Sequence, residues 1–151
     1  VAPGRSRRHA WHETLAAAGL PDGPTVVADF SAESGARATA ELLALAERPT
    51  AIVYANDLMA IAGTSAAQAR GLHVPDDLSV TGFDDTAISG YLRPPLTTVR
   101  TDAVAWGMAA AECLLELVNG GTATDVLLPP PELVLRNSTA PPRPTTETDL
   151  G

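Results

Sequence analysis

The stretch LSVTGFDD, residues 78–85, is a short apolar run that stops at a polar pair, Asp84-Asp85. A second run of the same kind, AIVYA at residues 51–55, stops at Asn56-Asp57. Unbroken apolar runs of this length are typical of parallel strands that are covered on both faces. Ligands of open α/β sheets bind just beyond the carboxyl ends of the strands. The two runs therefore indicate a site for a small polar molecule, with an amide and a carboxylate on one edge of a sheet.

Predicted helices alternate with predicted strands along the rest of the chain. Helices are expected over residues 5–18, 34–47, 58–70, 87–92 and 102–119, and strands over 25–28, 51–55, 78–83, 96–100, 126–128 and 133–135. This alternation favours βαβ units, so the expected fold class is α/β, an open parallel sheet flanked by helices. Right-handed crossovers would then place the ends of the parallel strands on one common edge. Residues 137–151, rich in Thr and Pro, are expected to be a disordered tail.

Composition excludes several classes of protein. The formal net charge of the 151 residues is −8, and the only basic cluster is at residues 5–9, so this chain alone is not expected to bind nucleic acid. All ten basic residues are Arg, which excludes a Lys nucleophile. No stretch is apolar enough to cross a bilayer, and no secretory signal opens the chain. The first residue is Val and not Met, which hints at a fragment.

The single cysteine, Cys113, excludes an internal disulfide and fits a reducing compartment, so we expect a cytoplasmic protein. Cys113 falls in an apolar helical pattern, where a buried and unreactive thiol is expected. His9, His12 and Glu13 superficially resemble a zinc-binding helix, but the two His are three residues apart and not four. The sequence shows no phosphate-binding loop and no catalytic set. We therefore expect no enzyme, no cofactor and no metal site.

Candidate binding residues fall at one topological position, close to the expected strand ends. They are Arg7, Phe30, Asn56, Asp84 and Thr101. The amide of Asn56 can donate and accept at once, and the carboxylate of Asp84 can accept from two hydroxyls. The ring of Phe30 can lie on the apolar face of a sugar or a base, and the planar fork of Arg7 suits a polyol or a carboxylate.

Each candidate also has a simpler explanation. Asn56 and Asp84 are common in helix caps and turns, and Phe30 can be a hydrophobic staple. Arg7 can belong to a solvated helix face, and Thr101 can cap the helix that follows it. Next to the candidates, Asp57 is expected to cap the helix after it, and Asp85 is expected to be the capping member of its pair.

Three blocks, at residues 51–57, 66–85 and 94–99, resemble in order and spacing the lactose-repressor (LacI/GalR) family of bacterial transcription regulators. The resemblance runs from about Arg5 to Pro141. It implies a type I periplasmic-binding-protein fold, in which two lobes close over a small effector such as a sugar. It also implies a homodimer whose separate N-terminal helix-turn-helix domains bind the operator.

The resemblance also assigns residues. Arg7, Phe30, Asn56 and Asp84 fall on effector-binding positions of the family, whereas Thr101 stands where several members carry a longer side chain such as Gln. A dimer surface would use Met59 and Ile61 on one helix, and Tyr91 and Leu92 in a later turn.

The chain matches only part of that architecture. Residues 1–136 are expected to be a partial effector-binding domain, the C-terminal lobe plus segments that cross back to the other lobe, with no DNA-binding domain. The helix over residues 102–119 would then lack its partner, so we expect it to pack in an unusual place or to be covered by another chain.

We therefore interpret the chain as the effector-binding part of a LacI-type regulator, whose ligand would allosterically control operator binding. Contact with DNA would occur only through the missing domain, and no membrane is involved. One alternative is a sugar-binding receptor of an ABC uptake system. Another is an enzyme on a similar sheet.

Overall fold

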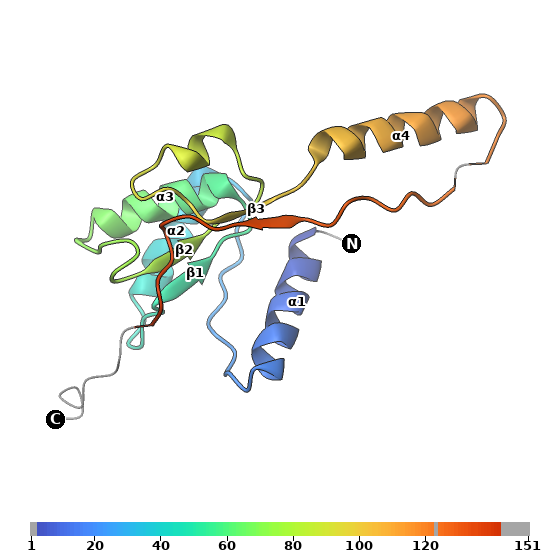
Figure 1. Ribbon diagram of the computed structural model, residues 1–151. Coiled ribbons are helices and arrows are strands. Elements are labelled where there is room, and N and C mark those ends of the chain that lie inside the picture. The colour runs from blue at the N-terminus through green and yellow to red at the C-terminus, as the bar shows by residue number, and fades with distance from the viewer. Residues whose placement is uncertain (1–2, 123, 143–151) are drawn as a thin grey trace.

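The computed structural model describes residues 3–122 and 124–142. The elements, in chain order, are α1 (Pro3–Ala17), α2 (Ala32–Leu43), β1 (Ala51–Val53), α3 (Asp57–Gln68), β2 (Ser79–Thr81), the 3-10 helix η1 (Ala87–Gly90), β3 (Thr98–Arg100), α4 (Ala103–Val118) and β4 (Glu132–Val134). From α2 onward helices and strands alternate as the sequence predicts, and the α/β class is confirmed. In Figure 1, α2, α3 and η1 gather with β1 and β2 into one body, whereas α1 and α4 stand apart from it.

The sheet is parallel over the strands that carry the predicted site. β1 and β2 pair in parallel, with Ile52 opposite Val80. An isolated parallel bridge between Thr81 and Thr97 connects β2 to the segment before β3. The expected open parallel sheet gains one antiparallel edge, because β3 pairs antiparallel with β4.

The core lies between this sheet and the pair α2 and α3. Its buried apolar residues are Leu42, Ile52, Tyr54, Met59, Ala60, Ala67, Val74, Leu78, Val80 and Leu96. Glycines let the elements approach closely: a Cβ at Gly35 of α2 would lie 2.6 Å from the Cα of Met59 in α3. A Cβ at Gly63 would lie 2.1 Å from the hydroxyl oxygen of Tyr54. That hydroxyl shares a 2.6 Å hydrogen bond with Thr39, which satisfies both buried groups.

The apolar sequences of the strands predict that both faces of the sheet are covered. This prediction is wrong. In β1, Ile52 is buried but Val53 is 65% exposed. The two predicted strands at 25–28 and 126–128 are also wrong. Residues 25–28 join no ladder, although Val26 and Ala28 pack against the core through their side chains. Residues 126–128 have an apolar sequence but no neighbouring strand, and Leu127 is 99% exposed.

The sequence predicts that a disordered tail begins at residue 137, but the first residues of this segment are ordered against the sheet. Ser138 is 2% exposed, and it brackets Val80 of β2 with two hydrogen bonds: its hydroxyl donates to the Val80 carbonyl at 2.6 Å, and its carbonyl accepts from the Val80 amide at 2.8 Å. The Asn137 amide donates to the carbonyl of Pro95 at 3.1 Å. Residues 137–140 therefore belong to the body, because the backbone groups of β2 need partners on that side. Residues 143–151 of the predicted tail lie outside the described residues.

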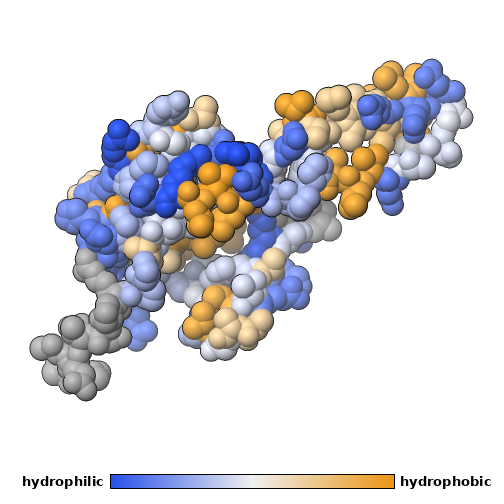
Figure 2. Space-filling model, viewed as in Figure 1, coloured by the Kyte–Doolittle hydropathy of each residue, from blue (hydrophilic) through white to orange (hydrophobic). Residues whose placement is uncertain are grey.

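Helix α4 carries its apolar side chains in the open. None of its sixteen residues is buried, and Val104, Met108 and Leu115 are all at least 60% exposed. Figure 1 shows α4 projecting from the body, and Figure 2 shows apolar surface over it. Cys113 is half-buried there, not buried as predicted. Among residues 3–122 and 124–142, nothing buries any residue of α4. The covering of α4 by another chain stays a prediction.

In the described part of the chain, no helix has both the length and the apolar character needed to cross a membrane.

Candidate functional site

The carboxyl ends of the strands meet at one edge, as the parallel pairing requires. The amide of Asp57, just after β1, donates to the carbonyl of Phe83, just after β2, at 2.8 Å. The amide of Asp84 donates to the carbonyl of Val99 in β3 at 2.9 Å. These two backbone bonds tie the ends of β1, β2 and β3 together. Any side chain that leaves these ends therefore starts from the same small region.

Arg7 reaches this edge from α1. Its Nη1 donates to the carbonyl of Ala55 at 2.6 Å, and its guanidinium carbon lies 3.7 Å from the centroid of the Phe83 ring. The stacking adds a cation–π attraction of about 0.5–1 kcal/mol. The planar fork has donors to spare after these contacts. The side chain of Arg7 therefore contacts the segments after both strands, through Ala55 and Phe83. The simpler explanation, an Arg on a solvated helix face, does not hold.

Asp84 presents an exposed carboxylate at the end of β2, with its backbone at a φ of 114°. Within residues 3–122 and 124–142, no side chain donates a hydrogen bond to this carboxylate. Partial burial and the charge of Asp57 raise its pKa, and the charge of Arg7 opposes this rise. Asp84 and Arg7 are thus close enough to interact electrostatically. A carboxylate with open acceptor positions and a guanidinium beside it can together hold neighbouring hydroxyls of a polyol.

Asn56 acts as the N-cap of α3, the role that the sequence assigned to Asp57. Its Oδ1 accepts from the amide of Met59 at 2.9 Å, and its Nδ2 donates to the carbonyl of Phe30 at 3.0 Å. Asn56 is therefore a helix cap, as its simpler explanation states. One hydrogen of its side-chain amide takes no part in these contacts. The same side chain brings Phe30 to the edge.

Phe30 has a φ of 69°, in the left-handed region, and is 43% exposed. It directly precedes Ser31, the N-cap of α2, so a hydrophobic staple would need an apolar side chain at Gly35. Since glycine has none, Phe30 is not a staple. Asp29 fixes the turn by accepting from the amide of Ser31 at 3.0 Å, and hydrogen bonds from Ser31 and Ser34 hold the pKa of Asp29 well below its usual range.

Among the described residues, the side chain of Thr101 makes no hydrogen bond to another candidate. It is half-buried, and its carbonyl accepts from the amide of Ala103. It is not a helix cap, because Asp102 caps α4 through Ala105. Of the five candidates, Arg7, Phe30, Asn56 and Asp84 lie at one edge.

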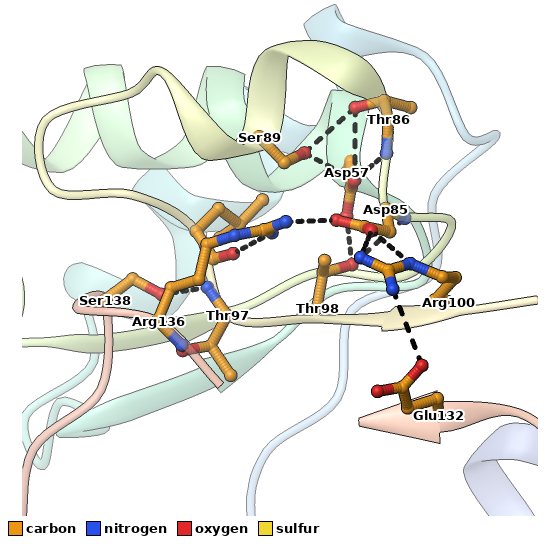
Figure 3. Close-up of polar contacts among 11 residues, drawn as sticks. Asp57, Asp85, Thr86, Ser89, Thr97, Thr98, Arg100, Glu132, Arg136 and Ser138 are labelled. Atoms are coloured by element: carbon orange, nitrogen blue, oxygen red, sulfur yellow. Dashed lines mark hydrogen bonds and ion pairs between the residues drawn. The ribbon is translucent and has the colours of Figure 1, made fainter. Parts of the chain in front are cut away.

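Asp57 is instead a buried hub that the sequence did not reveal. Its side chain is fully buried. Its Oδ2 accepts from the hydroxyl of Ser89 at 2.6 Å and from the amide of Thr86 at 2.8 Å. Its Oδ1 accepts from the hydroxyl of Thr98 at 2.5 Å. Figure 3 shows these groups converging from three segments. The available signal was the small hydroxyl residues at 86, 89, 97 and 98, whose donors suit a carboxylate.

Asp85 does not cap a helix. Its Oδ1 accepts from Arg136 at 2.6 Å and its Oδ2 from Arg100 at 2.7 Å (Figure 3). Burial would raise the pKa of Asp85, but the hydrogen bonds and charges of Arg136 and Arg100 outweigh it and lower that pKa. Arg100 also lies 3.5 Å from Glu132 of β4. No pattern in the sequence pairs these residues, which are up to 51 positions apart.

The predicted dimer residues divide in two groups. Met59 is 6% exposed and packs in the core against α2, so its assignment to a dimer surface is wrong. Leu92 is half-buried against the core and Ile61 is also half-buried. Tyr91 is 81% exposed.

Cavities of about 270 Å³ and 290 Å³ occur elsewhere, and neither is lined by a candidate residue. The larger one lies beside the starts of β1 and β2, around Thr50 and Asp77. The described residues contain no group of three side chains that could hold a metal ion.

Comparison with known proteins places the chain in a family. The periplasmic binding protein-like domain family matches residues 1–139. The lactose operon repressor of Klebsiella pneumoniae is 41% identical over 137 residues, covering 91% of this chain and 39% of that repressor. The transcriptional repressor PurR of Aliivibrio salmonicida is 35% identical over 116 residues, covering 76% of this chain and 35% of that repressor.

Solved structures agree. A LacI family transcriptional regulator from Mycobacterium smegmatis superposes with a TM-score of 0.84 at 38% identity, covering 92% of this chain and 53% of that one. The regulator CelR in complex with cellobiose gives a TM-score of 0.83 at 33% identity, covering 89% of this chain and 42% of that one. The chain thus spans between about a quarter and a half of the length of the proteins that it matches. It belongs to the periplasmic binding protein-like domain family, and the relatives that it matches include LacI-type transcriptional regulators.

Proposed function

We propose that this chain is the effector-binding part of a LacI-type transcriptional regulator and that it binds a sugar-like molecule at the edge formed by the ends of β1 and β2. The observation that carries the proposal is the juxtaposition of Arg7 and Asp84 at this edge, with the open carboxylate of Asp84 facing no protein donor in the described chain. A polyol supplies the adjacent hydroxyls that such a pair binds.

Each residue has a distinct role in this proposal. The carboxylate of Asp84 accepts from two hydroxyls of the effector, and Arg7 donates to a neighbouring oxygen. The ring of Phe30 lies on the apolar face of the sugar. Asn56 contributes its remaining amide hydrogen, and Thr101 contributes its hydroxyl at the margin.

In an intact regulator, a second lobe closes over this edge, and the effector binds the closed arrangement more tightly than the open one. The effector thereby biases the binding of DNA by N-terminal helix-turn-helix domains in a cytoplasmic homodimer, without catalysis or cofactor. The names of the matched proteins support this assignment over an uptake receptor: they include PurR and a lac repressor dimer bound to operator and an anti-inducer. The exposed Tyr91, with Ile61 and Leu92, would contribute to the dimer surface.

Isothermal titration calorimetry with cellobiose, maltose and lactose tests the site, first on this chain and then on a regulator that contains it. Asp84→Ala should lower the affinity for the bound sugar by at least about 30-fold, since it removes charge-assisted hydrogen bonds of about 2–3 kcal/mol. The matched control is Asp76→Ala, which removes an exposed carboxylate away from the edge. Unchanged sugar affinity in Asp84→Ala refutes the site, and the absence of binding to any sugar of a wider panel refutes the function.

A further inference from the structure

The turn after β2 holds two consecutive non-glycine residues at positive φ, 114° for Asp84 and 50° for Asp85. Non-glycine residues in this region strain the backbone, so the turn persists only where its surroundings fix it. Two backbone contacts contribute: Asp84 donates to the carbonyl of Val99 at 2.9 Å, and Asp85 donates weakly to the hydroxyl of Thr98 at 3.4 Å. Neither bond involves the carboxylate of Asp84 or of Asp85.

The side chain of Asp85 supplies the missing constraint. It is 8% exposed and accepts from two guanidinium groups at once, Arg136 on one oxygen and Arg100 on the other. Arg136 is itself anchored, since its Nη1 donates to the carbonyl of Leu96 at 2.7 Å. Arg100 is 52% exposed and is also drawn to Glu132. The clamp, defined here as Asp85, Arg136 and Arg100, thus joins the turn to β3 and to the segment after β4 (Figure 3).

The neighbouring carboxylates of Asp84 and Asp85 differ in their hydrogen-bond partners. Both oxygens of Asp85 are committed to protein donors, whereas those of Asp84 meet no donor within the described residues. The lowered pKa of Asp85 keeps its carboxylate charged at neutral pH, so the clamp persists under the conditions in which a regulator works. Because the two residues share a peptide unit, a displacement of Asp85 also displaces Asp84.

We propose that Asp85 is a positioning residue, held between Arg136 and Arg100, that orients the carboxylate of Asp84 toward the effector. The inference rests on the proposed function of Asp84, and it assigns part of the affinity for the effector to three residues that do not touch it. Loss of the clamp should therefore weaken binding without removing any ligand contact.

A double-mutant cycle measures this effect, with the sugar that binds the wild type best among cellobiose, maltose and lactose as the probe. Arg136→Gln and Asp85→Asn should each lower the affinity about tenfold, and the control Arg93→Gln, an exposed Arg outside the clamp, should leave it unchanged. Asp84→Ala combined with Asp85→Asn should bind no more weakly than Asp84→Ala alone, because Asp85 acts through Asp84. Additive losses, or no loss in the single variants, overturn the proposal.

A measurement without ligand separates this inference from the proposed function. The carboxyl carbon of Asp84 is titrated by NMR in the wild type and in Arg136→Gln. Removing a nearby positive charge alone would raise the pKa of Asp84 further, whereas release of the turn into solvent lowers it toward the ordinary value. A fall supports positioning even if no sugar binds; an unchanged or higher pKa overturns it. If Arg136→Gln fails to fold, Arg100→Gln removes the exposed half of the clamp and gives the same readout.

Discussion

Helices α3 and α4 are both apolar and both begin at a side-chain cap, Asn56 for α3 and Asp102 for α4. However, α3 buries five of its residues and α4 buries none. The interior positions of α3 are small, such as Ala60 and Gly63, which lets it approach α2 and the sheet. The face of α4 carries Leu, Met, Val and Trp, which need a partner surface. Apolar content therefore predicts that a helix needs cover, whereas the topology of the chain decides whether cover is present.

The largest difference between the two helices should appear at their first turns. Asp57→Ala leaves the donors of Thr86, Ser89 and Thr98 without their buried acceptor, and should lower the free energy of unfolding by more than about 3 kcal/mol. Asp102→Ala removes only the exposed cap of α4 and should cost about 1 kcal/mol. Urea denaturation followed by circular dichroism measures both. Equal losses would contradict the contrast between a buried hub and a local cap.

Glycines provide a matched pair in the two helices. Gly63→Ala in α3 places a methyl group against Tyr54 and Thr39 and should destabilise the chain by about 1–3 kcal/mol. Gly107→Ala in α4 meets no described atom within 4 Å apart from the nearby backbone of its own helix, and should stabilise the helix by about 0.5–1 kcal/mol. The opposite signs are measured as shifts of the thermal midpoint in the same buffer. A loss at Gly107 comparable to that at Gly63 would show that α4 is packed.

Acid should weaken the body through Asp85. The folded-state pKa of Asp85 is lowered, so its stabilising effect is present above its unfolded pKa of about 3.9 and is lost as the pH falls through the folded value. Asp85→Asn should therefore cost about 1–2 kcal/mol at pH 7, and this cost should shrink as the pH falls below about 3.9. Glu116→Gln, at an exposed position of α4, is the control with no expected change. A cost that is independent of pH would contradict the ionic character of the clamp.

The smallest change in stability is expected on the outer face of α4, where the effect is on association. Leu115→Gln should change the free energy of unfolding by less than about 0.5 kcal/mol, because Leu115 is 60% exposed. It should nevertheless weaken the self-association of the chain, since the apolar face of α4 needs another chain to cover it. Sedimentation velocity over a range of concentrations measures this. A wild type that stays monomeric throughout contradicts the expectation that another chain covers α4.

Local patterns were sufficient for most of the fold. The apolar runs ending at Asn56 and Asp84 predicted the ends of β1 and β2, and the periodic segments predicted α1 to α4. The failures have a common cause, which is that pairing is not local. Residues 25–28 and 126–128 have strand-like sequences but no neighbouring strand, and the polar Ser138 is fixed only because β2 needs its hydrogen bonds.

For the candidate site, the sequence predicted positions better than it predicted the roles of single residues. The rule for strand ends placed Asn56 and Asp84 at one edge without reference to tertiary contacts. Phe30 lies at the same edge although the strand predicted before it is absent, and Arg7 reaches the edge from a helix. The roles of single acidic residues were not predictable, since Asn56 and not Asp57 caps α3, and Asp57 and Asp85 bind donors that are distant in sequence. Which member of this acidic pair is buried goes with its distant partners Arg100 and Arg136, which the local sequence does not reveal.

Ser138 also sets an order of events during synthesis. Its hydrogen bonds close on Val80, 58 residues earlier, in the middle of the sheet. A nascent chain that has emerged only as far as β3 therefore still lacks Ser138, the buried partner of Val80. The ribosome must release nearly the whole of this lobe before the sheet can complete its bonding, so the half-made product leaves one side of β2 exposed to other chains.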